Sequence, residues 1–180
     1  MSYFYNFPKI DYFNKKSRNI ILKSSMISDV MNKVDAFYPY IIKDYERPDT
    51  IAYEEYGDEN LDWVIYFSNS VIDPYYDWPL TDDQLKTYLE KKYNTSIYSL
   101  QSQILHYVYT GIAGESEEDI ARKSYIMSPT TFSYSPASGW VPKYTYDYEV
   151  ELNEAKRSIK LLNKFYIPQI KKEIASIFKK

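Results

Sequence analysis

The clearest pattern of hydrophobic and polar positions lies in residues 41–56. Residues 41–45 begin with two isoleucines and end in tyrosine, which predicts a strand, and the polar residues 46–50 predict a turn into a helix. Asp49 is the expected N-cap of this helix, because its carboxylate can accept a hydrogen bond from an amide that the first turn leaves unpaired. Gly57 is expected to end the helix in the left-handed conformation.

A second helix is predicted directly after Gly57. Asp58 is a suitable cap for a helix that begins at Glu59, and the segment 61–67 is apolar at six of its seven positions. Such a segment is typical of a helix that is enclosed on most sides. The two helices are expected to share one small core, which contains Ile51, Ala52, Trp63, Val64 and Ile65.

An aromatic segment at 75–80 follows a turn at 69–74 and is flanked by Pro74 and Pro79, which stiffen it. A rigid aromatic segment can cap its own module or present its rings to another chain. Both interpretations stay open for the three aromatic residues, which are Tyr75, Tyr76 and Trp78. The next residues, 81–84, have the spacing of a capping box, and apolar positions at helical intervals predict a third helix up to residue 93.

The amino-terminal residues 1–16 contain many large apolar side chains without a helical or strand period, which predicts an extended arm. Chain ends seldom hold such groups in order unless they are docked, so partner contact is favoured here. The residues expected to make that contact are Phe4, Tyr5, Phe7, Pro8 and Tyr12. A short strand at 20–22 and a helix at 29–37 are weaker predictions.

The second half of the chain gives fewer signals. A strand is predicted at 104–109, a short helix capped at 116–119, and a loop at 128–142 with three prolines. Apolar and polar residues alternate at 146–152 and again at 158–161, which predicts a β-hairpin. The chain is expected to end in an amphipathic helix that starts near 166–168 and carries a stripe of isoleucines.

Tyrosine dominates the composition, with 22 of 180 residues. Tyrosine is enriched where proteins meet proteins, although an AT-rich genome would also favour it, and both explanations stay open. The formal net charge of -3 and the lack of basic runs disfavour nucleic-acid binding. The absence of cysteine excludes disulfides and thiolate sites, and no apolar stretch is long enough to span a bilayer, so we expect a soluble protein made in a cytoplasm.

No residue pattern indicates catalysis. His106 is the only histidine, and a lone histidine is more often a hydrogen-bonded structural residue than a base or a ligand. The adjacent carboxylates Glu54 and Glu55 do not face each other on a helix and are expected on its solvated side. We therefore expect a protein that is not an enzyme, with no catalytic residues, no cofactor and no metal.

Three separated blocks of residues are characteristic in their order. The first block is Tyr5-x-Phe7-Pro8-Lys9-Ile10-x-Tyr12. The second block consists of Arg47-Pro48-Asp49-x-Ile51-Ala52-Tyr53, Tyr56-Gly57-Asp58, Trp63-Val64-Ile65, Asn69, Ile72-Asp73-Pro74-Tyr75-Tyr76 and Trp78. The third block is Tyr148-Glu149-x-x-Leu152-Asn153-Glu154-x-Lys156-Arg157-x-Ile159-Lys160-Leu161-Leu162. In these blocks the chain resembles the baseplate wedge protein 53 family of contractile-tailed, T-even-like bacteriophages. Residues 95–145 add little to the resemblance.

The resemblance implies a structural subunit of the wedges that surround the central tail hub, joining neighbouring wedge proteins during baseplate assembly. The implied partners are other baseplate wedge and hub or tail proteins, in several copies within a sixfold-symmetric assembly, with no nucleic acid and no membrane. The implied location is the virion, after synthesis in the host cytoplasm. The central segment also resembles a LysM module, so a LysM-type peptidoglycan-binding protein is the alternative, although the departure at 75–80 makes peptidoglycan an unlikely ligand. A small muralytic enzyme is a third possibility that we do not expect.

The expected fold class is α+β, with a small LysM-like βαα module, an extended amino-terminal arm, and a carboxyl-terminal β-hairpin plus helix. Four segments are expected along the chain. They are an arm with short elements at 1–40, the module with its added third helix at 41–93, a weakly defined strand and loop region at 94–145, and the hairpin with the amphipathic helix at 146–180.

Overall fold

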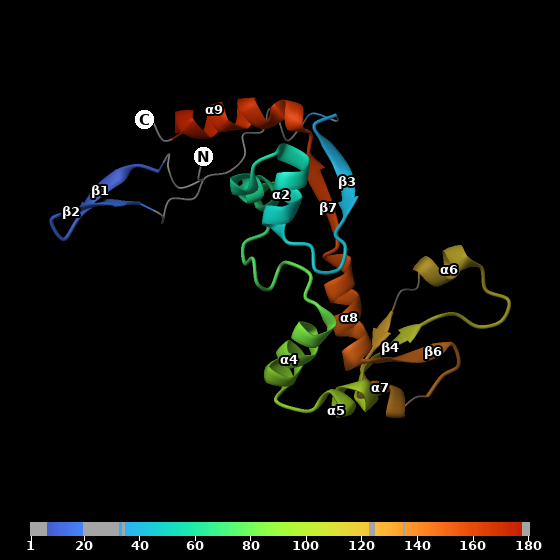
Figure 1. Ribbon diagram of the computed structural model, residues 1–180. Coiled ribbons are helices and arrows are strands. Elements are labelled where there is room, and N and C mark those ends of the chain that lie inside the picture. Colours follow the sequence, from blue (N-terminus) through green and yellow to red (C-terminus); the bar gives the residue numbers. More distant parts are fainter. Residues whose placement is uncertain (1–6, 20–32, 34, 123–124, 135, 178–180) are drawn as a thin grey trace. The chain divides into compact units, whose positions relative to one another are not determined.

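The computed structural model describes residues 7–19, 33, 35–122, 125–134 and 136–177 and has an α+β fold (Figure 1). The chain forms two compact units. Unit 1 contains Met1–Pro79 and Lys156–Lys180, and unit 2 contains Leu80–Ala155. The chain therefore leaves unit 1, builds unit 2, and returns to complete unit 1.

Unit 1 is built around two antiparallel strands from distant parts of the chain. Strand β3 (Phe37–Ile41) pairs with β7 (Ser158–Leu162), with Phe37 opposite Leu162 and Ile41 opposite Ser158. Between these strands the chain forms, within unit 1, α2 (Pro48–Tyr56), the 3-10 helix η2 (Glu59–Leu61) and α3 (Asp62–Ser68). After β7 come the 3-10 helix η3 (Lys164–Tyr166) and α9 (Ile167–Ile177).

One hydrophobic core joins these elements. The most deeply buried side chains come from the residue after β3 and from α2, η2, α3, β7 and α9, and they include Ile42, Ile51, Leu61, Val64, Ile65, Leu161, Leu162 and Ile170. The core residues expected from the sequence, Ile51, Ala52, Trp63, Val64 and Ile65, all lie in it. Burial of a side chain of this size stabilises the fold by about 1.5–3 kcal/mol, so the returning strand β7 contributes substantially to unit 1.

Unit 1 also contains a β-hairpin near the amino terminus, where the sequence predicted an arm without a strand period. Strands β1 (Lys9–Tyr12) and β2 (Lys15–Arg18) pair in register, with Tyr12 opposite Lys15. Phe13 and Asn14 connect them with φ values of 48° and 60°, as in a type I′ turn. The extended arm expected at 1–16 was predicted without a strand period, whereas residues 9–18 form a paired hairpin, whose turn was not recognised because it contains no glycine.

Unit 2 combines helices with a three-stranded antiparallel sheet. The sheet has the order β5-β4-β6, with β4 (Ile104–Tyr109) between β5 (Ile126–Met127) and β6 (Trp140–Tyr144). The helices are α4 (Asp82–Tyr93), α5 (Ile97–Ser102), α6 (Glu117–Arg122), α7 (Pro129–Tyr134) and α8 (Thr145–Ala155). Leu85, Leu89 and Leu100 form its buried centre.

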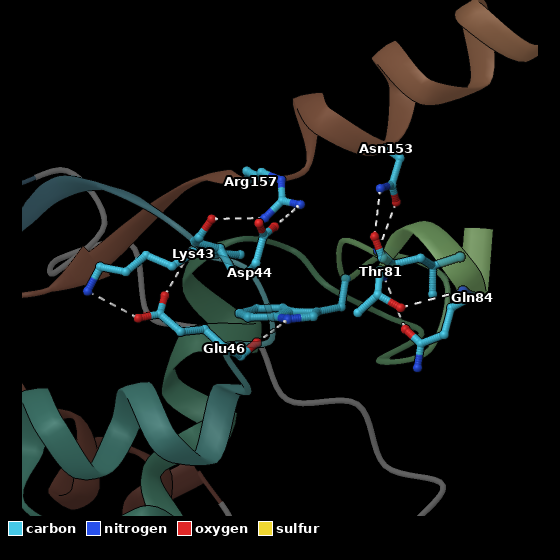
Figure 2. A network of polar contacts seen from close by, with 10 residues as sticks. Lys43, Asp44, Glu46, Thr81, Gln84, Asn153 and Arg157 are labelled. Atoms are coloured by element: carbon cyan, nitrogen blue, oxygen red, sulfur yellow. Dashed lines mark hydrogen bonds and ion pairs between the residues drawn. The ribbon is translucent and has the colours of Figure 1, made fainter. Parts of the chain in front are cut away.

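Several local predictions are confirmed. Gly57 ends α2 with a φ of 72°, and its amide donates to the Tyr53 carbonyl at 2.9 Å. Asp58 caps the next helical segment by accepting from the Asn60 amide. Thr81 and Gln84 form the capping box of α4, with the Thr81 amide donating to Gln84 Oε1 at 3.2 Å (Figure 2). The strand at 104–109 and the carboxyl-terminal helix are also present.

The strand predicted at 41–45 and the Asp49 cap are wrong in detail. Strand β3 ends at Ile41, and Tyr45 has a φ of 65°, which places it in a turn. Arg47 is the N-cap of α2 and Pro48 occupies the first turn, so Asp49 already lies inside the helix. Proline is favoured at the first helical position because its missing amide is not needed there and its φ is preset.

The hairpin predicted from 146–152 and 158–161 is also wrong. Residues 145–155 form helix α8, and β7 pairs with β3 instead. The buried face of α8 is polar, with Thr145, Glu149 and Asn153 spaced four residues apart, so the apolar pattern pointed to the wrong period. The loop predicted at 128–142 contains α7 and the start of β6.

Some predictions lie outside the described residues. They concern Phe4 and Tyr5, the strand at 20–22, and most of the helix at 29–37, of which only 33 and 35–37 are described and none is helical. Among the helices of the described ranges, none is long and apolar enough to cross a membrane.

Candidate partner-binding surface

The segment 72–78, here called the strap, has a backbone conformation fixed by its own hydrogen bonds. The amides of Ile72 and Asp73 both donate to Asp77 Oδ2 at 2.9 Å, and the Tyr75 amide donates to Asp73 Oδ1 at 2.9 Å. The backbone bonds from Asp73 and Ile72 hold the pKa of the exposed Asp77 carboxyl below its ordinary value. Two aspartates thus order the loop without a regular element.

Trp78 attaches the strap to the core of unit 1. Its side chain is 8% exposed, and its indole N–H donates to the Glu46 carbonyl at 3.0 Å. The Tyr66 ring packs edge-on against it, with the ring centroids 6.4 Å apart. Lys156 Nζ additionally donates to the Tyr76 carbonyl. The sequence left open whether this segment caps its own module or contacts another chain, and Trp78 caps its own module.

The remaining large side chains of the strap face solvent. Ile72 is 91% exposed, Tyr75 80% and Tyr76 54%. Ile72 was not among the contact residues predicted from the sequence, although its position directly before the aspartate and proline of a turn indicated exposure. A loop that is ordered by its backbone and holds three large side chains in solvent has the character of a binding surface.

The turn before α2, against which Trp78 lies, is stabilised by a set of polar contacts around Glu46 (Figure 2). The Glu46 carboxylate accepts from the Tyr40 hydroxyl at 2.9 Å and from the Lys43 amide at 2.8 Å. Burial alone would raise the pKa of Glu46, but the bonds from Lys43 and Tyr40 outweigh it and the pKa is lowered. Burial, and then the hydrogen bond to Glu46, raises the pKa of Tyr40 to about 12.

Arg157 ties the same turn to the returning chain. Its guanidinium contacts Asp44 Oδ1 at 2.7 Å and the Ile42 carbonyl at 3.3 Å (Figure 2). Arg157 lies directly before β7, so these contacts hold the end of β3 and the start of β7 together. The turn that supports the strap is therefore stabilised by residues from both chain segments of unit 1.

Near the amino terminus, the expected contact residues divide into buried and exposed ones. Phe7 is buried and Pro8 is half-buried, whereas Tyr12 is exposed on β1. Phe13, which the sequence analysis did not single out, is 83% exposed at the turn, and its ring meets Tyr12 edge-on at 4.6 Å. The signal for Phe13 was the following Asn14, which tolerates the left-handed conformation of a hairpin turn.

Of the residues weighed for catalysis, His106 and Glu55 make structural contacts and Glu54 is exposed. His106 lies in β4, with its ring edge-on to Tyr148 at 5.7 Å. Glu54 is exposed as predicted, but Glu55 is half-buried and accepts from the Tyr38 hydroxyl. Within the part of the chain that the structure describes, no three histidine or carboxylate side chains come together as a metal site would require.

Unit 2 has its own buried polar contacts. Glu149 on α8 accepts from Lys92 Nζ at 2.7 Å and from the Tyr93 hydroxyl at 2.6 Å, both at the end of α4. Burial alone would lower the pKa of Lys92, but the bond to Glu149 and its charge raise it. These contacts join α4 to α8.

The exposed strap is a surface suited to contacts with other proteins. Comparison with known families is consistent with such contacts: the base plate wedge protein 53 family matches residues 5–116, more than half of the chain. The chain belongs to this family and has a structural role in the baseplate of a bacteriophage tail, in contact with other baseplate proteins. The match includes the first two sequence blocks and ends before the third. No curated protein matches the chain.

Proposed function

We propose that this protein joins neighbouring wedge proteins around the central hub while the baseplate assembles. Its partners would be other wedge and hub or tail proteins, in several copies with sixfold symmetry. It would be synthesised in the host cytoplasm and become part of the virion. The observation that best supports this proposal is the ordered strap, which holds Ile72, Tyr75 and Tyr76 exposed.

The energetics of association favour such a strap as a contact. Ordering a flexible loop on binding costs free energy, and a loop that is already fixed by Asp73 and Asp77 avoids most of that cost. Tyrosine adds a large contact area with few rotatable bonds, and binding energy concentrates in such residues. The strap is thus suited to contribute a central part of an interface.

Co-expression tests this function with a matched control. The double variant Tyr75→Ser with Tyr76→Ser removes two rings but keeps the backbone bonds of the strap. The control, Tyr98→Ser with Tyr134→Ser, removes two rings that are 84% and 86% exposed in unit 2. Each form is co-expressed with the other wedge proteins of the phage and isolated through a tag. We expect the strap variant to lose co-purification and the control to retain it; equal recovery of both would contradict the proposal.

A LysM-like glycan-binding role is the second candidate. It is supported by the order β3, α2, α3 and β7, in which two strands enclose a helix pair. In this chain α3 leads into the strap and unit 2 before β7, so any glycan groove would be bordered by different loops. Sedimentation of the full chain with purified peptidoglycan tests this role, and a protein that stays in the supernatant while a known LysM domain sediments would exclude it.

A further inference from the structure

The hairpin β1–β2 combines features that its contacts with the described residues do not explain. Every residue of β1, and all of β2 except Arg18, is exposed, and two-stranded hairpins alone are marginally stable in water. Its turn places Phe13 in the left-handed conformation, which is unfavourable for a bulky residue, while leaving the ring exposed. Strain of this kind persists at positions where it serves a function.

The two faces of the hairpin differ in chemistry. Because successive side chains alternate, Ile10 and Tyr12 share one face with Ser17 and Lys15 of β2, and Phe13 extends it at the turn. The opposite face carries Lys9, Asp11, Lys16 and Arg18. Residues 9–18 contain four cations and one anion, a net charge of +3, within a chain whose net charge is -3. The hairpin is therefore a basic element with an aromatic tip on an otherwise acidic protein.

We propose that the hairpin docks tip-first on another baseplate protein, with Tyr12 and Phe13 in an apolar pocket whose rim carries carboxylates. The pocket accommodates the edge-on ring pair, and the carboxylates meet the lysines that flank it. Charge complementarity of this kind steers association and fixes the orientation of docking. The proposal rests on the wedge-joining function and assigns one of its contacts.

The chemistry of the tip favours a protein partner over a nucleic acid. A phosphate-binding hairpin would direct its cations toward the backbone, whereas here the outermost group is the Phe13 ring and Asp11 lies among the cations. The whole chain carries -3 and the hairpin +3, so the remaining residues carry a net charge of -6. The basic hairpin could therefore also associate with the acidic remainder of a second copy. Both become outcomes of the experiment.

The variant Phe13→Asn tests the tip without damaging the turn. Asparagine accepts the left-handed conformation, so the hairpin is retained and relieved of strain while the ring is lost. The full chain and the variant are titrated against purified wedge assemblies that lack this protein. We expect binding at least tenfold weaker with an unchanged or raised melting temperature. Unchanged affinity of the variant, or a lowered melting temperature that shows Phe13 to be structural, would overturn the proposal.

Charge reversal and cross-linking identify the partner surface. Lys15→Glu with Lys16→Glu should slow association at low salt, because these lysines lie beside the turn, while the control Lys164→Glu with Lys172→Glu should not. A photoreactive benzoylphenylalanine at position 13 should cross-link to a carboxylate-rich segment of another wedge protein. Cross-links to a second copy, to the same chain or to nucleic acid would overturn the proposal. If the unmodified protein does not bind the assemblies, the wedge-joining function itself fails; if only the hairpin variants bind normally, the function stands without this contact.

Discussion

Replacement of Asn153 by alanine is expected to destabilise unit 2 strongly. Asn153 is 3% exposed, and its amide pairs with both backbone groups of a single residue (Figure 2). The Leu80 amide donates to Asn153 Oδ1 at 2.8 Å, and Asn153 Nδ2 donates to the Leu80 carbonyl at 2.9 Å. The side chain thus takes the place of a neighbouring strand at the point where unit 2 begins.

The magnitude depends on the burial of this pair, in which Asn153 is buried and Leu80 is half-buried. Removing one partner of a buried hydrogen bond leaves the other group unsatisfied, at a cost of about 1–3 kcal/mol for each bond. For two bonds we expect a loss of about 3 kcal/mol from the free energy of unfolding. Because 1.4 kcal/mol corresponds to a factor of ten, the Leu80 amide should exchange about a hundredfold faster with solvent.

Asn69 provides a matched control in unit 1. Its side chain also pairs with both backbone groups of one residue, accepting from the Lys160 amide at 2.7 Å and donating to the Lys160 carbonyl at 2.9 Å. Its Nδ2 also donates to the Ile65 carbonyl within the same helical turn at 2.9 Å. Lys160 is exposed, so water can replace the lost bonds, and Asn69→Ala should cost only about 1 kcal/mol. Urea unfolding and amide exchange of both variants provide the measurements. Equal losses, or a loss below 1 kcal/mol for Asn153→Ala, would refute the reasoning.

Three further predictions concern unit 1. Gly57→Ala should reduce the free energy of unfolding by about 1 kcal/mol in thermal melts, because φ is +72° while no atom lies within 4 Å of an added Cβ. Burial, followed by the hydrogen bond to Glu46, raises the pKa of Tyr40 to about 12. The stability that Tyr40 contributes is therefore fully present below pH 10 and is lost as the pH rises toward 12. In urea unfolding, the free energy of unfolding of Tyr40→Phe should fall less between pH 8 and pH 11 than that of the native chain. Trp78→Phe removes the bond to the Glu46 carbonyl and should cost about 1 kcal/mol or more, with increased proteolysis at the strap; unchanged proteolysis would show that Trp78 does not hold it.

The sequence predicted best where local chemistry determines local structure. The left-handed Gly57, the Asp58 cap and the Thr81–Gln84 capping box are each specified by residues a few positions apart, and all three are confirmed. The apolar run of α3 likewise identified a buried helix. Such signals depend on propensity and patterning and do not require knowledge of the tertiary fold.

Where the partner is distant in the sequence, prediction failed. Strand β3 finds its partner β7 only after unit 2, and the alternation at 146–152 suggested a nearer strand. The buried face of α8 is made of polar residues whose partners, such as Lys92 for Glu149 and Gln103 for Thr145, lie more than forty positions away. For the strap, the sequence predicted the aromatic residues but not which of them is buried. Trp78 is buried against the Glu46 carbonyl, 32 positions earlier in the chain, and no local pattern indicates that contact.

The edges of the β3–β7 sheet limit how partners can bind unit 1. The Lys160 backbone is taken by Asn69 and the Leu162 amide donates to the Tyr56 hydroxyl at 3.2 Å, so side chains cover the outer edge of β7. The backbone N–H and C=O of Lys160 point away from β3, so the backbone of the opposing Pro39 points away from β7, toward the outer edge of β3. Proline has no N–H to offer at that edge. Neither edge presents the regular row of donors and acceptors that an added strand requires. We therefore expect partner contacts at the β3–β7 sheet to use side chains rather than an added strand. The exposed large side chains of unit 1 include those of the strap and the hairpin tip, together with Tyr45, Tyr53 and Phe165.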